Sequence, residues 1–521
     1  MRLALAAVTG GVLVAAACSA ASRDDVAASN DDDGGIASDA SLADTTTTDG
    51  AVDARKCPAG QDFCGGRCID VTQDDENCGA CATSCTGGAH CAEAKCTASK
   101  IEHVVLIVQE NHSFDSYFGR YCQAPAGSAP TCTDGRACCE RAPDTEPGGA
   151  TPLTLDDASN FAKDRDHEQA CEVQQIHGGA MDRFVTGATG ASTCLGSGPS
   201  CSSPENFGLA QATTVGTYWT YADNGALADR WFQPIAGGSS SNDMYFATSH
   251  FQFVDNTLLP KGTGSPKNCA VPSLCIGGTE TQLQGTTIAD LLLAAGKDFA
   301  VYADGLAEAK AVSPTCPSAP AACPYANCIS HPIACYGCMY DASDIPFAYF
   351  AQFAEGPHLK DYASLKTDLS IGRLPAFSYV KARAFHNEHP NVSTITDGAK
   401  FVKATVDAVL ASSAADSTLI LVTWDEGGGF FDHVPPPPGI DDDPESPIHP
   451  IPYGTRVPTL AIGPFAKKGH VSHVTMEHSS VVRFLEYNFI GPTGQLGVND
   501  AKVHNIGSLL DPTATGIVIP D

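Results

Sequence analysis

The sequence has few basic residues, with 30 Lys and Arg against 60 Asp and Glu in 521 residues, which gives a net charge of −30. This balance argues against a specific nucleic-acid partner, because phosphate backbones are bound by clustered positive charge. Long apolar runs are also missing: beyond the N-terminus none reaches the about 18 residues that a transmembrane helix needs. An acidic protein that handles an anionic substrate needs a local positive centre, and a bound metal ion is the usual one.

Two common hydrolase motifs are absent. The chain has no Gly-x-Ser-x-Gly elbow, which disfavours a serine-hydrolase triad. It has no His-Glu-x-x-His helix either, which disfavours the corresponding zinc proteases.

Residues 1–18 have the pattern of a secretory signal, with Arg2, an apolar stretch and small residues before Cys18. The ending resembles a bacterial lipoprotein signal, which implies a lipid anchor at Cys18 and attachment to the outer membrane or cell surface. The alternative is cleavage after an Ala-x-Ala site, which would give a secreted or periplasmic protein. The 23 cysteines also favour an oxidising compartment.

Three segments are expected after the signal. Residues 19–56 are acidic and almost without large apolar residues, so they predict a disordered tether. Residues 57–96 hold eight cysteines and predict a disulfide module whose pairing the sequence cannot choose. Zinc at Cys78 and Cys81 is a weak alternative, because the other spacings are irregular. The module resembles Cys-rich modules on myxobacterial surface proteins, which implies a spacer or interaction role.

Residues 99–515 predict the main domain. Short apolar runs typical of buried strands alternate with helical patterns, which indicates an α/β fold with a mostly parallel sheet sandwiched by helices. The expected strands are 104–108, 299–302, 376–380, 419–423 and 459–462, and the expected helices are 287–295, 401–411 and 479–487. The fourteen later cysteines predict up to seven disulfides, and five of them cluster in a Pro-rich insertion that walls the pocket or lies outside it.

Polar residues that follow two of these strands are candidate ligands, because ligands gather at the carboxyl ends of parallel strands. Glu110 and Asn111 follow the first strand, and Asp425 and Glu426 follow the run 419–423 with Trp424. Carboxylate and amide oxygens suit a hard divalent ion. The two pairs could form one oxygen site, although each could also lie on a solvated loop rim.

Ser239 stands in the glycine-bordered segment Gly237–Asn242 and is a candidate nucleophile, with a flexible Gly/Ser loop as the alternative. His167 and His389 are further candidates, although singly each could be a surface or structural histidine.

Two long stretches carry a family resemblance: residues 101–119, IEHVVLIVQENHSFDSYFG, and residues 424–437, WDEGGGFFDHVPPP. Shorter matches include GGAMDRF at 178–184 and RLPAFSY at 373–379, which lie between the two stretches, and EHSS at 477–480, which lies after them. With these matches the chain resembles the bacterial phospholipase C and acid phosphatase family, a branch of the alkaline-phosphatase-like α/β folds.

The resemblance implies a metal-dependent phosphoesterase that forms a phosphoserine. Ser239 would be the nucleophile, and His167 and His389 would contact the phosphoryl oxygens or the leaving group. One divalent metal ion of unknown identity would be held by Glu110, Asn111, Asp425 and Glu426.

The sequence leaves two classes of phosphate ester open as the substrate. The chain stops at Asp521, without the C-terminal β-domains usual in phosphocholine-specific relatives, which favours an acid-phosphatase-like enzyme. The pocket histidine that often precedes the family's Asn-Pro-Phe segment is absent from the matching residues 344–347. Phospholipase C activity is the alternative, and a non-catalytic surface binding protein is a third possibility.

Overall fold

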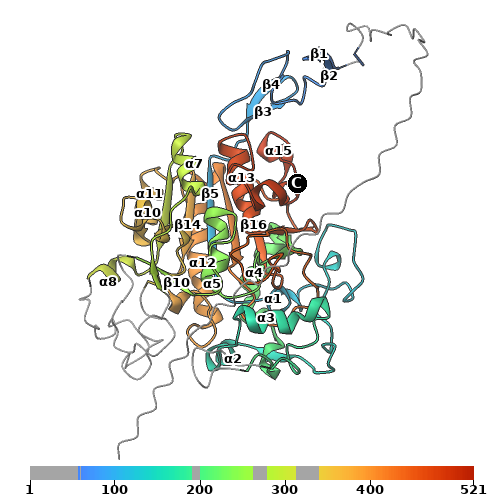
Figure 1. The fold of residues 1–521 in the computed structure, drawn as a ribbon, viewed down its shortest axis with the longest axis vertical. Coiled ribbons are helices and arrows are strands. Elements are labelled where there is room, and N and C mark those ends of the chain that lie inside the picture. Colours follow the sequence, from blue (N-terminus) through green and yellow to red (C-terminus); the bar gives the residue numbers. More distant parts are fainter. Residues whose placement is uncertain (1–56, 59, 190–199, 262–278, 312–339) are drawn as a thin grey trace, which may run out of the picture. The chain divides into compact units, whose positions relative to one another are not determined.

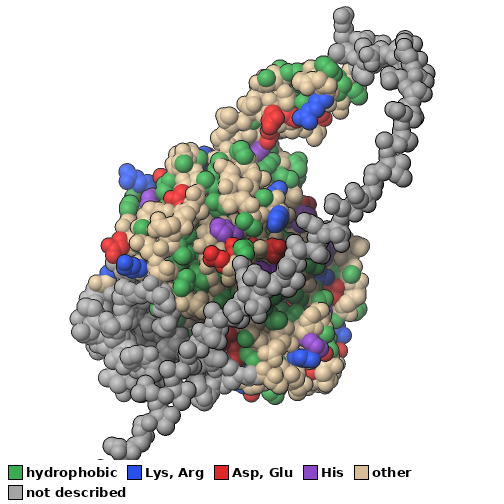
Figure 2. All heavy atoms as spheres, viewed as in Figure 1, with side chains coloured by type: hydrophobic (Ala, Val, Ile, Leu, Met, Phe, Trp, Pro, Cys, Tyr) green, Lys and Arg blue, Asp and Glu red, His purple; other side chains and the backbone are tan. Residues whose placement is uncertain are grey.

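The computed structural model describes residues 57–58, 60–189, 200–261, 279–311 and 340–521. The predicted signal, Cys18, the tether 19–56 and the Pro-rich insertion lie outside these residues. Within the described part, no helix combines the length and the apolar character that crossing a membrane requires. On the face drawn in Figure 2, Lys and Arg side chains stand in small separate groups, so positive charge is not gathered into one broad area there.

The cysteine-rich segment is a disulfide scaffold, as predicted. Two antiparallel pairs, β1 (Asp62–Cys64) with β2 (Arg67–Ile69) and β3 (Ala89–Ala92) with β4 (Lys95–Ala98), are its strands. Zinc at Cys78 and Cys81 is ruled out here, because each of them is bonded to another cysteine. The disulfides of the segment are Cys57–Cys68, Cys64–Cys81, Cys78–Cys91 and Cys85–Cys96.

Three of the disulfides predicted further along the chain are present among the described residues. They are Cys122–Cys139, Cys132–Cys138 and Cys171–Cys201.

An eight-stranded sheet forms the centre of the main domain (Figure 1). The strands from β13 to β15 in the spatial order run parallel, β16 is antiparallel to both its neighbours, and β17 is parallel to β8. The predicted mostly parallel sheet is therefore confirmed. In spatial order the strands are β13 (Leu359–Asp361), β12 (Phe299–Ala303), β14 (Phe377–Lys381), β5 (His103–Gln109), β15 (Thr418–Trp424), β16 (Thr459–Ile462), β8 (Ala226–Ala228) and β17 (His470–Ser472).

All five expected strands are strands of this sheet. Every residue of β12, β14, β15 and β16 is buried, which explains why these segments show apolar runs rather than an alternating pattern. β8, β13 and β17 are only three residues long, which gives too little pattern to predict them from the sequence.

Helices sandwich the sheet, and the three predicted ones are present. α4 (Ala212–Asn224) packs on α12 (Ile395–Leu410), and α7 (Ile288–Ala294) packs on α13 (Ser479–Phe489). α12 begins six residues before the predicted position because Thr394 caps it, with its hydroxyl accepting a hydrogen bond from the Asp397 amide at 3.1 Å.

The register of the central strands brings three strand ends together. β5 lies between β14 and β15, with Trp424 opposite Gln109 and Lys381 opposite Val108. Because these strands are parallel, the residues that follow them emerge at the same edge of the sheet.

Glu486 in α13 gives the fold a pH-dependent stability. Burial and the nearby Asp500 carboxylate raise the pKa of Glu486 to about 8, although its oxygens accept hydrogen bonds from the amides of Gly494 (2.7 Å) and Gln495 (3.0 Å). The folded protein then holds this proton more tightly than the unfolded chain does. The stabilisation is complete below about pH 4.5 and is lost as the pH rises through about 8.

We expect the ionisation of Glu486 to lower the free energy of unfolding by roughly 1–3 kcal/mol between pH 5 and pH 9. Glu486→Gln keeps the shape of the protonated side chain and should flatten this dependence. Urea unfolding of both proteins over this pH range measures it, and equal pH slopes would contradict the assignment.

Candidate active site

The residues that follow β5 and β15 meet at the edge of the sheet. Glu110, Asn111, Asp425 and Glu426 are all buried, with at most 1% of each exposed. The Asn111 amide donates to Asp425 Oδ1 at 3.0 Å, and the Glu426 amide donates to the same oxygen at 2.7 Å. Two segments more than three hundred positions apart therefore form one cluster of oxygen donors.

The glycines after Glu426 allow this approach. Gly428 has a φ of +62°, and a Cβ built on it would lie 2.1 Å from the carbonyl oxygen of Asn111. Any side chain at Gly428 would therefore push the two segments apart.

Ser239 lies beside this cluster at the start of α5 (Ser239–Asp243). Its hydroxyl donates a hydrogen bond to Asn111 Oδ1 at 3.3 Å, and the side chain is only 3% exposed. Asn242 fixes the turn that precedes the helix, since its Nδ2 donates to the carbonyl oxygens of Gly237 (2.9 Å) and Gly238 (3.1 Å). The segment is thus an ordered turn into a helix, not a free Gly/Ser loop.

The two candidate histidines lie at the same place. His167 Nε2 lies 3.3 Å from Asn111 Nδ2 and 3.8 Å from Glu426 Oε1. Its Nδ1 donates to the Arg165 carbonyl at 2.6 Å, so Nε2 is the nitrogen that faces the cluster. The His389 ring centroid is 5.9 Å from that of His167.

The electrostatics of the cluster call for a cation. Burial raises the pKa of Asp425 well above its usual value and that of Glu426 to about 8, and neighbouring carboxylates add to both shifts. Burial alone would lower the pKa of His167, but the Glu426 carboxylate is the main cause that raises it, to about 10.

A divalent ion fits these residues. Among the described side chains, Asp425 Oδ2 and Glu426 Oε1 are buried polar atoms without a hydrogen-bond partner. Carboxylate oxygens without a hydrogen bond are costly when buried, and they are the donors that hard divalent cations prefer.

Two further residues at the cluster were not foreseen from the sequence. Asp243 ends α5, and one of its carboxylate oxygens lies within 4.8 Å of an oxygen from Glu110 and one from Asp425. Lys381 ends β14 and forms ion pairs with Glu110 and Asp243. The rule that singled out Glu110 and Asp425 could have found Lys381, because it too stands at the carboxyl end of a buried strand.

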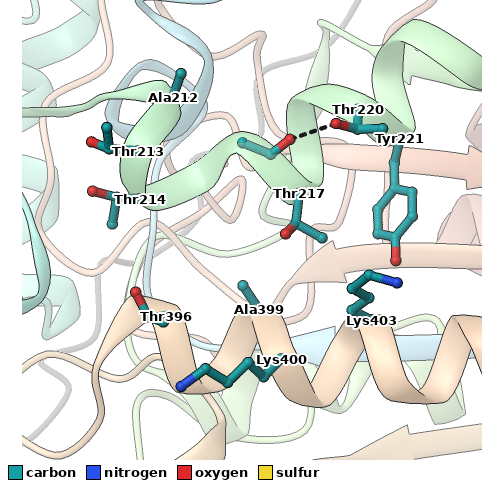
Figure 3. A pocket seen from close by; sticks show the side chains of 11 residues that line it. Ala212, Thr213, Thr214, Thr217, Thr220, Tyr221, Thr396, Ala399, Lys400 and Lys403 are labelled. Carbon is teal, nitrogen blue, oxygen red and sulfur yellow. Dashed lines mark hydrogen bonds between the residues drawn. The ribbon is translucent and has the colours of Figure 1, made fainter.

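A separate pocket of about 540 Å³ lies between α4 and α12. Figure 3 shows threonine side chains of α4 on one side of it and Lys400 and Lys403 of α12 on the other. None of the candidate catalytic or metal-binding residues lines this pocket.

Two protein-family models match the chain. The Phosphoesterase family model matches residues 101–490, which include every candidate site residue. The Stig1 model, the stigma-specific STIG1-like protein family, matches residues 41–102 and so covers the cysteine-rich segment.

Curated relatives include a non-hemolytic phospholipase C of Pseudomonas aeruginosa, 27% identical over 428 residues, with 75% of this chain and 54% of the relative covered. Phospholipase C B of Mycobacterium tuberculosis is 27% identical over 452 residues, with 78% and 77% covered. The chain thus spans about half the length of the Pseudomonas relative. Among solved structures, a protein in the alkaline phosphatase superfamily from Vibrio parahaemolyticus matches with a TM-score of 0.33 and 11% identity, over 79% of this chain and 73% of that one.

Proposed function

Because the chain belongs to the Phosphoesterase family, we propose that it is a metal-dependent phosphoesterase that hydrolyses phosphate esters through a phosphoserine at Ser239. The observation that carries this proposal is the position of the Ser239 hydroxyl, 3.3 Å from the Oδ1 of Asn111, whose backbone amide binds Asp425 in a cluster that holds carboxylate oxygens without hydrogen-bond partners. A nucleophile next to a cation-binding cluster is the arrangement that phosphoryl transfer requires.

One divalent ion would be held by Glu110, Asn111, Asp425 and Glu426. When bound, such an ion lowers the pKa of a nearby hydroxyl and neutralises charge on the phosphoryl oxygens. Asn111 joins the two parts of the site, because its side chain contacts both Ser239 and His167.

In the first step the Ser239 hydroxyl releases its proton to solvent as Oγ attacks phosphorus, and the bond from phosphorus to the ester oxygen breaks. The departing alkoxide takes a proton from His167 Nε2 or from His389, and the alcohol leaves. In the second step water attacks the phosphoserine, the phosphorus–Oγ bond breaks and the departing Ser239 Oγ takes up a proton from solvent. The histidine that lost its proton accepts one from this water, so the cycle closes.

The substrate class is proposed as an acid-phosphatase-like monoester, with phospholipase C activity as the second candidate. The second candidate is favoured by the relatives, whose names describe phospholipases C. We also propose that the protein is exported, with Cys18 as its lipid anchor. Seven disulfides among the described residues support an oxidising compartment.

A substrate panel tests the proposal on the full chain. We expect hydrolysis of p-nitrophenyl phosphate, bis-p-nitrophenyl phosphate or phosphatidylcholine that a chelator abolishes and that added Mg²⁺, Mn²⁺, Ca²⁺ or Zn²⁺ restores. Turnover of the first substrate alone supports the phosphatase, and turnover of the lipid alone supports the phospholipase. No turnover of any substrate with any of these ions would instead favour a non-catalytic binding protein.

A further inference from the structure

Lys381 is a buried cation inside the carboxylate cluster. Its side chain is 2% exposed, and its ammonium contacts Glu110 Oε1 and lies 3.1 Å from Asp243 Oδ2. Asp243 is fully buried, and its other oxygen accepts a hydrogen bond from the Tyr379 hydroxyl at 2.9 Å. Asp243 therefore fixes the position of the ammonium.

The three carboxylates around Lys381 are close enough to one another to bind a metal ion. Single oxygens of Glu110, Asp243 and Asp425 all lie within 4.8 Å of one another, and all three residues are buried. Three negative charges at such distances repel strongly in a medium of low polarity unless a positive charge lies among them.

Glu110 and Asp425 belong to two groups of ligands at once. On one side they join Asn111 and Glu426 next to Ser239, and on the other side they join Asp243. Shared carboxylates between two such groups are what a two-metal centre uses, with the ions about 3.5–4 Å apart.

We propose that the Lys381 ammonium takes the place of a second metal ion, so that the centre binds one divalent cation. This inference rests on the metal site of the proposed function. Lys381 lowers the negative charge of the cluster by one and cannot dissociate from the chain. Asp243 keeps it next to Glu110 rather than against the ion at the nucleophile.

The test counts metal ions per chain. The full-length protein is dialysed against Mn²⁺ or Zn²⁺, and bound metal is measured by mass spectrometry and titration calorimetry. We expect one ion for the unaltered protein and two for Lys381→Met, whose neutral side chain leaves Glu110, Asp243 and Asp425 free to bind a cation. Lys360→Met is the matched control, because Lys360 pairs with Asp368 at the surface, and it should bind one ion.

A second variant keeps the inference testable if Lys381→Met does not fold. Asp243→Asn leaves the ammonium with Glu110 alone, so it competes with the metal for that ligand, and we expect ion affinity to fall at least about tenfold. One ion in folded Lys381→Met, or unchanged affinity in Asp243→Asn, would overturn the inference. Absence of any ion from the unaltered protein would instead contradict the proposed function.

Discussion

Ser239→Ala is expected to lower kcat by at least about 10³-fold on every phosphate ester that the protein hydrolyses. The variant lacks the oxygen that forms the bond to phosphorus, and alanine offers no substitute. The fold should be unaffected, because the hydrogen bond from this hydroxyl to Asn111 is the only one described for it and the turn is held by Asn242. Initial rates with saturating substrate measure the effect, and thermal unfolding checks the fold.

Ser241→Ala is the matched control for this experiment. Ser241 lies in the same short helix and is equally buried, but its hydroxyl donates to the Gly238 carbonyl at 2.7 Å rather than facing Asn111. We expect its kcat to stay within about fivefold of the unaltered protein. Acid-quenched enzyme should carry phosphate on the peptide with Ser239. Loss of activity in Ser241→Ala with an active Ser239→Ala would place the nucleophile elsewhere.

The position of each ligand pair at the carboxyl end of a buried strand was predictable, because this information is local. The run 419–423 is apolar except for Thr423 and is followed at once by Trp424 and then carboxylates, which is how a buried parallel strand ends at a polar site. Gly428 reinforces the pattern, since only glycine fits against the Asn111 backbone.

The pair of Lys381 and Asp243 could not be inferred in the same way. Their contact depends on β14 lying beside β5, and strand order is not written in the sequence. A buried lysine at a strand end is also easily mistaken for an exposed one, because lysine is rarely buried without a partner. The antiparallel direction of β16 was missed for a similar reason, since a short buried run has no direction of its own.

A motif alone does not show whether a histidine within it has a structural or a catalytic role, as His112 illustrates. His112 lies in the motif at residues 101–119 next to Asn111, yet its Nδ1 donates to the Glu110 carbonyl at 2.9 Å and its Nε2 lies 3.1 Å from Asn160 Oδ1. Burial lowers its pKa to about 3, so it is neutral and supports the backbone of the site. Composition alone cannot separate such a histidine from His167.

Asp425→Asn is expected to weaken binding of the divalent ion at least about 100-fold and to lower kcat at least about 10³-fold. Asparagine keeps the oxygen that accepts from the amides of Asn111 and Glu426. It loses the second carboxylate oxygen, Oδ2, which has no partner among the described residues and is the atom available to an ion. Calorimetric titration with metal and initial rates at saturating metal measure the two effects.

The stability of the metal-free variant distinguishes loss of a ligand from loss of the fold. Without metal, Asp425→Asn should unfold at the same temperature as the unaltered protein or higher, because it removes one of several buried like charges. Asp441→Asn is the contrasting control: Asp441 is a buried carboxylate elsewhere, which accepts from the Phe251 amide (2.8 Å) and the Tyr245 hydroxyl (3.1 Å). Asp441→Asn should unfold at a lower temperature than the unaltered protein yet bind the divalent ion as the unaltered protein does. If Asp425→Asn binds metal and turns over like the unaltered protein, Asp425 is a structural residue and the ion lies elsewhere.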